Sequence, residues 1–162
     1  PRRRRAWRRS APWGPVTPYV KGADAYDEGG PEAWPSEFDI AKWALFVAVQ
    51  NGRWVGGAAV AVDAPGIYIL HGRDDVVALW DLRVDPEIRR SGVGTRLFGY
   101  AADWTRDQGY KQLRIETQNV NVPACRFYAA RGCELGVVDR FFYEGHPEVG
   151  HEVMLAWHLD LD

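Results

Sequence analysis

The chain predicts an α/β or α+β fold with a mixed sheet, and three observations lead to this class. Two apolar, strand-like segments flank Asn51-Gly52, a residue pair typical of a tight β-hairpin. A strand, an amphipathic helix and another strand then follow in the order of a parallel crossover. After a short helix, two more strand-like segments complete the order. A sheet that contains both a hairpin and a crossover is mixed.

The hairpin is expected to pair a buried strand at residues 44–50 with a strand at residues 53–63. Within the second strand, Gly56-Gly57 indicates a bulge or a close approach of another backbone. A third strand is expected at residues 77–84, after a loop.

A helix is expected over residues 91–108, because apolar residues recur there at three- and four-residue steps: Val93, Leu97, Tyr100, Ala101 and Trp104. Gly109 is a typical C-terminal glycine. The strand at 112–117 should lie parallel to the third strand, since a helix of this length serves as the crossover. The remaining expected elements are a short helix and two strands, at residues 123–131, 133–139 and 152–159.

Composition points to one ordered domain. The chain has 162 residues, of which 46% are hydrophobic and 13% aromatic, enough for a core. We expect this domain at 37–162, preceded by a loosely structured Arg/Pro-rich segment at 1–36. Because the chain begins with Pro1, we expect its native start to be missing or processed. No apolar run approaches the ~20 residues that span a bilayer, so no membrane role is expected.

The two cysteines, Cys125 and Cys133, are too few for a disulfide framework or a zinc site. Both have apolar neighbours, so we expect buried, inert thiols in a reducing, cytoplasmic setting.

Charge is distributed unevenly. Six arginines lie within residues 1–10, and the rest of the chain has 14 basic against 22 acidic residues. An acidic body favours cationic partners and makes nucleic acid an unlikely one, except through the arginine segment itself.

The most informative segment joins the third strand to the long helix. Gly92 and Gly94 lie at the helix start, where backbone N–H groups and the positive end of the helix dipole favour an anion. Glycine lets a ligand approach this backbone closely, and Arg89 and Arg90 add positive charge. These features together are typical of a pyrophosphate site.

A dinucleotide-binding turn is the rival interpretation, since Glu116 ends the next strand at a suitable distance for a ribose. Two features argue against it. Leu97 occupies the position of the third glycine, and seven residues separate Val84 from Gly92 where a tight turn is needed.

The segment Arg89-x-x-Gly92-x-Gly94, after Leu82-x-Val84-x-Pro86, resembles motif A of the GNAT superfamily of N-acetyltransferases. Asn121-x-x-Ala124-x-x-Phe127-Tyr128 resembles its motif B. Within the superfamily, residues 80–84, 116–128 and 132–136 are similar to the streptothricin acetyltransferases. The resemblance implies a mostly antiparallel sheet with a central, splayed parallel strand pair flanked by helices.

The resemblance also implies acetyl-CoA as cosubstrate. The residues expected to bind it are Leu82, Arg83, Val84, Arg89, Arg90, Ser91, Gly92, Val93, Gly94, Thr95, Asn121, Ala124, Phe127 and Tyr128. Tyr128 would also protonate the departing CoA sulfur, and main-chain N–H groups of the third strand would polarise the thioester oxygen.

The acceptor is expected to be a small-molecule primary amine. Glu116 is the candidate base or water-positioning residue, and Trp80, Asp81, Glu116 and Tyr143 are candidate acceptor contacts. Residues 141–144 combine aromatic faces with an acid, which suits a cation. The acidic and histidine residues near the C-terminus lack the helical spacing of a metal site, so no metal is expected.

Several alternatives stay open from sequence. The acceptor could be a streptothricin-like amine, a polyamine, an amino-acid derivative, or a protein lysine or N-terminus. A non-catalytic acyl-CoA-binding sensor would keep the glycine turn and Asn121, whereas the presence of Tyr128 favours an enzyme. Relatives are often dimers, so a homodimer is among the states that stay open.

Overall fold

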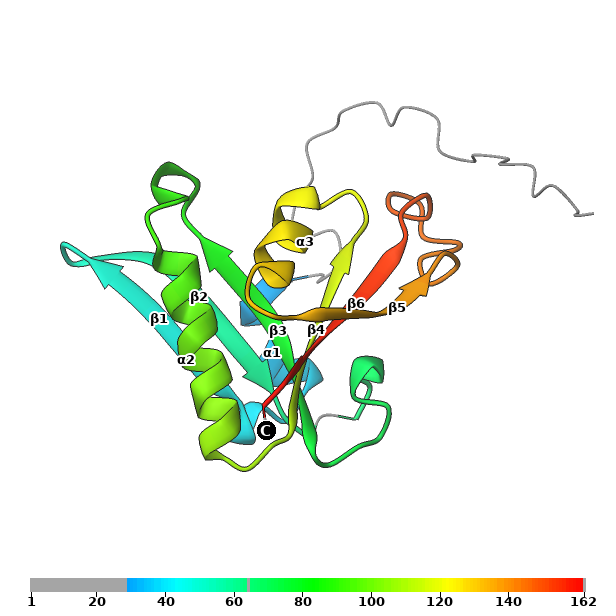
Figure 1. Cartoon of the computed structure of the whole chain (residues 1–162), viewed down its shortest axis with the longest axis horizontal. Coiled ribbons are helices and arrows are strands. Elements are labelled where there is room, and N and C mark those ends of the chain that lie inside the picture. Colours follow the sequence, from blue (N-terminus) through cyan, green and yellow to red (C-terminus); the bar gives the residue numbers. More distant parts are fainter. Residues whose placement is uncertain (1–28, 64, 162) are drawn as a thin grey trace, which may run out of the picture.

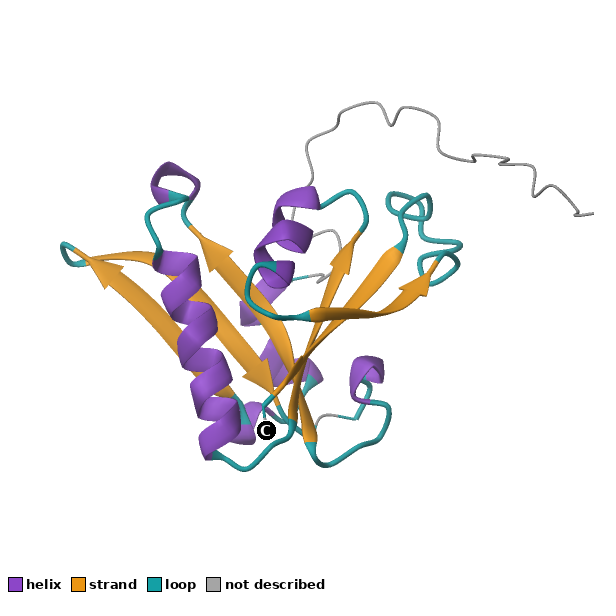
Figure 2. Cartoon of the chain, in the orientation of Figure 1, coloured by secondary structure: helices purple, strands orange, loops and turns teal. Residues whose placement is uncertain are grey.

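A computed structural model describes residues 29–63 and 65–161 of the chain. The helices are α1 (Trp34–Glu37), α2 (Val93–Asp107) and α3 (Val122–Ala129), together with 3-10 turns. The strands are β1 (Ala44–Gln50), β2 (Arg53–Ala61), β3 (Val76–Val84), β4 (Gln112–Gln118), β5 (Glu134–Asp139) and β6 (Met154–Asp160) (Figure 2). The expected arginine segment at residues 1–10 and most of the expected lead-in lie outside the described residues.

The strands form one sheet in the order β1-β2-β3-β4-β6-β5. All neighbours are antiparallel except β3 and β4, which are parallel and joined by α2 as the crossover. The predicted mixed, mostly antiparallel sheet with a central parallel pair is therefore confirmed, and the predicted strands agree with the observed ones to within two residues at each end.

The hairpin turn follows from local chemistry. Asn51 and Gly52 have φ angles of 52° and 74°, the left-handed pair that lets a two-residue turn match the strand twist. Gly56 is required for a different reason: a Cβ there would lie 2.7 Å from the carbonyl oxygen of Arg83 on β3. The predicted close approach thus occurs between β2 and β3.

The prediction that residues 44–50 form a buried strand is wrong for one of its faces. Leu45, Val47 and Val49 are 57%, 52% and 58% exposed, whereas the alternate residues Phe46 and Ala48 pack toward α2. The reason is positional: among the described residues β1 pairs only with β2, so it is an edge strand covered on one face.

The long helix begins two residues later than predicted. Arg90 and Gly92 have φ angles of 67° and 89°, and these left-handed residues hold the chain out of helical geometry until Val93. Leu97 and Ala101 are buried as the periodicity predicts, but Tyr100 is 63% exposed because it lies at the margin of the apolar face.

Two cores cover the faces of the sheet. On one face, α2 and α3 pack over β2, β3 and β4, with Leu97, Phe98 and Tyr128 among the buried residues. On the other face, Trp34 and Trp43 pack with loop residues such as Ile69. No helix in the described ranges 29–63 and 65–161 is long and apolar enough to cross a membrane.

Candidate active site

The centre of the sheet opens where β3 and β4 stop pairing. Their parallel pairing runs only from Val76–Gln112 to Leu79–Ile115, although both strands continue. Figure 1 shows the two strands side by side at one end and separated at the other, where α3 lies. Beyond Leu79 and Ile115 the two strands keep their outer partners, β2 and β6, but the edges that face each other have no strand partner, so backbone N–H and C=O groups on these inner edges face the gap.

A β-bulge lies at the same point on β3. The register with β2 shifts between Ala59, paired with Asp81, and Val60, paired with Leu79, so Trp80 has no direct partner. A bulge bends the strand and increases its twist, and thereby turns β3 away from β4. Bulge and lost pairing together form the splay that the family resemblance implies.

A cleft of about 710 Å³ lies beside this gap, on the face that carries α2 and α3. It is lined by Leu82, Arg83, Val84, Asp85, Pro86, Arg89, Gly94, Val120, Asn121, Pro123, Ala124, Phe127 and Tyr128. Of the predicted cofactor-binding residues, nine therefore lie in one cleft: Leu82, Arg83, Val84, Arg89, Gly94, Asn121, Ala124, Phe127 and Tyr128. Its volume falls within the range of small-molecule sites.

The turn at one end of the cleft leads into the N-terminus of α2. Gly92 is the N-cap residue, with φ 89°, and it offers no side chain to the first N–H groups of the helix. Those groups have no partner within the helix, and they carry the positive end of its dipole. Arg89, exposed and lining the cleft, adds a cation. The turn has the geometry of an anion cradle.

The absence of a side chain at Gly94 keeps the cleft open next to the N-terminus of α2. A Cβ at this position would lie 3.4 Å from Val84 Cγ2 and 3.7 Å from Phe127 Cε2, between the two walls of the cleft. A side chain larger than a methyl group there would fill part of the cleft, which Gly94 leaves open. The residues present therefore fit a pyrophosphate-containing group.

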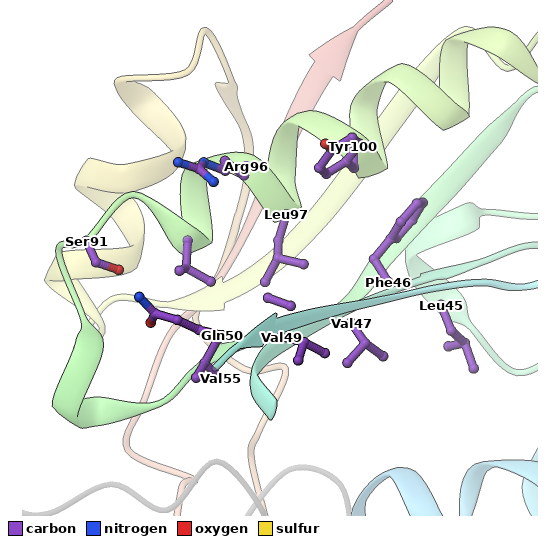
Figure 3. Close-up of a pocket in the computed structure, with 12 residues that line it drawn as sticks. Leu45, Phe46, Val47, Val49, Gln50, Val55, Ser91, Arg96, Leu97 and Tyr100 are labelled. Carbon is purple, nitrogen blue, oxygen red and sulfur yellow. The ribbon is translucent and has the colours of Figure 1, made fainter. Parts of the chain in front are cut away.

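The other residues predicted to bind the pyrophosphate from this turn are not among those that line the cleft. Arg90, Gly92 and Thr95 do not line the cleft. Ser91 and Val93 line a second groove of about 540 Å³, between β1 and the first turns of α2 (Figure 3). Thr95 accepts a hydrogen bond from Arg131.

Tyr128 lies on α3 with its ring 8% exposed and lines the cleft. Burial raises the pKa of its phenol far above the ordinary value, with smaller contributions from Cys133 and Asp81. No partner within residues 29–63 and 65–161 hydrogen-bonds to its hydroxyl. The phenol is therefore neutral across the physiological pH range, and its hydroxyl can donate a hydrogen bond.

Asn121 caps α3, because its Oδ1 accepts a hydrogen bond from the N–H of Ala124 at 3.3 Å. Phe127 contacts Phe98 edge-on, with ring centroids 5.8 Å apart, and Arg131 stacks over its face at 3.4 Å. These contacts fix the wall of the cleft that α3 supplies.

Glu116 is the first residue of β4 beyond the paired stretch, and it lies on the opposite face of the sheet from the cleft, beside Ala156. Its Oε1 accepts a hydrogen bond from the Tyr143 hydroxyl and its Oε2 from the Tyr68 hydroxyl. Gln118 Nε2 in turn donates to the Tyr143 oxygen at 2.9 Å. We call these four residues the Glu116 cluster.

The phenols of the Glu116 cluster stay protonated. Burial, followed by the negative charge of Glu116, raises the pKa of both Tyr68 and Tyr143 well above the ordinary value. Each phenol therefore remains a hydrogen-bond donor to Glu116.

Asp81 and Trp80 also reach this face. Asp81 Oδ1 forms an ion pair with Arg83 Nε at 2.6 Å, so its charge is partly balanced within its own strand. Trp80 packs into an aromatic group with Phe38 and Trp43, at centroid distances of 5.3 and 6.0 Å. The four predicted acceptor contacts thus lie on the same face of the sheet, next to the gap between β3 and β4. Among them, Tyr143 donates a hydrogen bond to Glu116.

Tyr68 and Gln118 are members of the cluster that sequence reasoning missed. Tyr68 begins a 3-10 helix, Tyr68–Leu70, in the β2–β3 loop, where no motif or periodicity marks it. Gln118 is the last residue of β4, and its position two residues after Glu116, on the same face of a strand, is the signal that was available.

The two cysteines form no disulfide. Cys133 is buried as expected, whereas Cys125 is only half-buried, so the expectation of a buried thiol is wrong for Cys125. Burial raises the pKa of Cys133 to about 11. Cys133 is therefore a thiol and not a thiolate at neutral pH.

Comparison with known proteins decides the family. Residues 17–133 match the model of the Acetyltransferase (GNAT) family. The chain belongs to this family. In this GNAT chain, the splay between β3 and β4 agrees with the fold that the resemblance implies, and Gly94 and Tyr128 line the cleft beside it.

The curated relatives include streptothricin acetyltransferases. The chain is 35% identical over 78 residues to streptothricin acetyltransferase A of Bacillus subtilis, covering 48% of this chain and 44% of that protein. It is 31% identical over 130 residues to the streptothricin acetyltransferase of Streptomyces lavendulae, covering 79% and 65%. The matched stretch is therefore less than two thirds of either relative's length.

A solved structure supports the fold. A provisionally named streptothricin acetyltransferase from Bacillus anthracis str. Ames, in complex with acetyl coenzyme A, superposes with a TM-score of 0.64. It is 28% identical, and the match covers 74% of this chain and 63% of that one.

Proposed function

We propose that this GNAT protein is an acetyl-CoA-dependent N-acetyltransferase whose acceptor is a cationic, small-molecule primary amine. The observation that carries the proposal is the gap between β3 and β4 beyond Leu79 and Ile115. A cleft with an anion cradle opens to it from one face, and a carboxylate held by two phenols lies on the other. Two ligands can therefore meet there from opposite faces of the sheet.

The cleft side would hold the donor. Acetyl-CoA would supply an acetyl group activated as a thioester. The N–H groups at the start of α2, together with Arg89, suit its pyrophosphate, and the β4-facing edge of β3 at residues 80–84, which has no strand partner, suits the amides of its pantetheine arm. Main-chain N–H groups of the same stretch would polarise the thioester oxygen.

Tyr128 would act as proton donor. Its hydroxyl has no competing partner among the described residues, and burial keeps the phenol protonated. It lines the cleft that would hold the donor, so it can deliver a proton to the sulfur that leaves.

Glu116 would receive the acceptor. Two roles follow from its position: it could take a proton from the amine through a water molecule, or it could hold a positively charged group of the acceptor. Hydrogen bonds from Tyr68 and Tyr143 already occupy one acceptor position on each oxygen, which favours the second role. Asp81 would contact the acceptor amine from β3, next to Trp80.

A streptothricin-like amine is the acceptor class we favour. Two features support it: the streptothricin acetyltransferases among the relatives, and the excess of acidic residues outside the arginine segment. A cationic acceptor is attracted by such a surface and by the Glu116 cluster.

A thiol-release assay with acetyl-CoA tests the proposal, using streptothricin, spermidine, free lysine and a lysine peptide as acceptors. We expect selective release with streptothricin. A matched Tyr128→Phe variant should bind acetyl-CoA normally but turn over more slowly. Tight acetyl-CoA binding without release for any amine would support an acyl-CoA-binding sensor instead, and absence of binding would refute the donor assignment.

A further inference from the structure

An acidic residue lines the same cleft as the anion cradle. Asp85 directly follows β3, and together with Pro86 and Arg89 it forms part of the cleft wall. Its side chain is only 18% exposed, so solvent screens its charge less than that of a fully exposed acid. A carboxylate repels other anions nearby. Beside a pyrophosphate, this carboxylate is therefore unfavourable unless its charge is balanced.

Asp85 also shapes the turn that leads to the cradle. Its Oδ1 accepts a hydrogen bond from the N–H of Glu87 at 2.9 Å and so caps the 3-10 helix Pro86–Ile88. Its C=O accepts from the N–H of Ile88 at 3.0 Å, and the C=O of Ile88 accepts from the N–H of Ser91 at 3.2 Å. The cap requires an acceptor oxygen but not a charge, because an amide oxygen serves as well as a carboxylate oxygen.

The charge that balances Asp85 comes from the β1–β2 hairpin. Arg53 is the first residue of β2, directly after the hairpin turn. Its Nη2 lies 2.9 Å from Asp85 Oδ2 and 3.7 Å from Glu87 Oε2. β2 and β3 run antiparallel, so the hairpin end of β2 lies beside the end of β3 that leads into the turn (Figure 1). The N–H of Asp85 also donates to the C=O of Val55 on β2, at 3.0 Å.

This ion pair contributes little to the stability of the fold, because Arg53 is 69% exposed. Its larger effect is on the electrostatic potential of the cleft. With Arg53 in place, the pair it forms with Asp85 is neutral. Without it, a single negative charge lines the cleft. Arg53 is not among the residues that line the cleft, so it influences a ligand there through Asp85.

We propose that Arg53 is a positioning residue for the donor, which neutralises the Asp85 carboxylate and holds it at the turn, and so keeps the cleft favourable for the pyrophosphate of acetyl-CoA. The inference rests on the proposed acetyltransferase function and adds a residue outside the cleft on which donor affinity depends. Its effect is confined to binding, since the pyrophosphate takes no part in the transfer of the acetyl group.

Calorimetric titration of Arg53→Gln with acetyl-CoA tests the proposal. We expect affinity to fall about fivefold at low salt and less at high salt, as for the loss of a partly exposed charge pair. KM for acetyl-CoA should rise by the same factor, with kcat and KM for the acceptor amine unchanged. Arg73→Gln is the matched control, because Arg73 also pairs with an aspartate, Asp75, at 2.7 Å, and neither lines the cleft. Unchanged affinity in Arg53→Gln would overturn the proposal.

A second substitution separates charge from shape. Asp85→Asn keeps an oxygen for the N–H of Glu87 but removes the negative charge. Added to Arg53→Gln, it should restore the affinity for acetyl-CoA to near the wild-type value, because no unbalanced charge remains. A double variant as weak as Arg53→Gln alone would mean that the arginine does not act through the charge of Asp85, and would overturn the proposal.

A truncated donor distinguishes this role from general damage to the fold. S-acetylpantetheine has the thioester and the pantetheine arm but no phosphate. Its kcat/KM in thiol release should be the same in Arg53→Gln as in the wild type, whereas kcat/KM for acetyl-CoA should fall about fivefold. An equal fall for both donors would overturn the charge role. Failure of the wild-type chain to bind acetyl-CoA would refute the proposed function and this inference together, whereas normal wild-type affinity that Arg53→Gln leaves unchanged would refute the inference alone.

Discussion

The cleft beside the β3–β4 gap and the Glu116 cluster lie on opposite faces of one sheet but are assembled differently. The cleft is built from one continuous unit, from Leu82 on β3 to Tyr128 on α3, around a helix N-terminus. The cluster joins Glu116 to Tyr68 and Tyr143, which are 48 and 27 positions away in the chain, through loops. Backbone geometry dominates the first, and side-chain contacts between loops dominate the second.

This difference suggests how the two sites respond to change. A site made of backbone N–H groups and glycines depends on steric space, so one added side chain can abolish binding. A site made of loop side chains can change selectivity without loss of the fold.

The largest effect is expected at Gly94. Gly94→Val places two methyl groups between Val84 and Phe127, so acetyl-CoA affinity should fall by about 100-fold or more, ~2.7 kcal/mol. Isothermal titration measures it. Gly99→Ala on the same helix is the control, since a Cβ there meets nothing within 4 Å and should leave affinity unchanged. Normal affinity in Gly94→Val would mean that the ligand lies elsewhere.

The second-largest effect is expected at Tyr128, on the rate of acetyl transfer and not on acetyl-CoA affinity. Tyr128→Phe removes the hydroxyl but keeps the ring that contacts Phe98, at a centroid distance of 6.0 Å. We expect kcat to fall about 100-fold, with acetyl-CoA affinity unchanged. Thiol release measured across pH checks this. Full turnover at every pH would exclude Tyr128 as the proton donor.

The third effect is electrostatic. Arg89→Gln removes an exposed charge at the cleft, and we expect acetyl-CoA affinity to fall about tenfold at low salt and less at high salt, because salt screens exposed charges. Titration at two ionic strengths measures it. Arg106→Gln, at the far end of α2, is the matched control. A loss that does not depend on salt would indicate a role in shape and not in charge.

The smallest effect separates two roles of Asn121. Asn121→Ala removes the α3 cap and should lower the free energy of unfolding by about 1 kcal/mol. Asn121→Asp keeps an acceptor for the Ala124 N–H and should retain stability, yet it places a negative charge in the cleft and should weaken acetyl-CoA binding. Urea denaturation and titration together distinguish the two. Unchanged binding in Asn121→Asp would leave Asn121 a cap alone.

Much of the fold was predictable because its signals are local. Asn51 and Gly52 readily adopt the positive φ angles of a two-residue hairpin turn. The spacing of Val93, Leu97 and Ala101 indicates a helix with one apolar face. The exposure of Leu45, Val47 and Val49 was not predictable, since an apolar strand has the same composition at an edge as in the centre of a sheet.

The candidate site also has features that the local sequence predicts and features that it does not. Sequence alone determined the motifs that identify a GNAT protein, and with them the turn at Gly92 and Gly94 and the tyrosine of α3. Each depends on residues a few positions apart, whose conformations are set by local sterics and hydrogen bonding. Only the tertiary structure decided that β3 bulges at Trp80, or that Tyr68 and Tyr143 donate to Glu116. Contacts between residues far apart in the chain depend on how whole strands and loops pack, and no short-range pattern in the sequence encodes them.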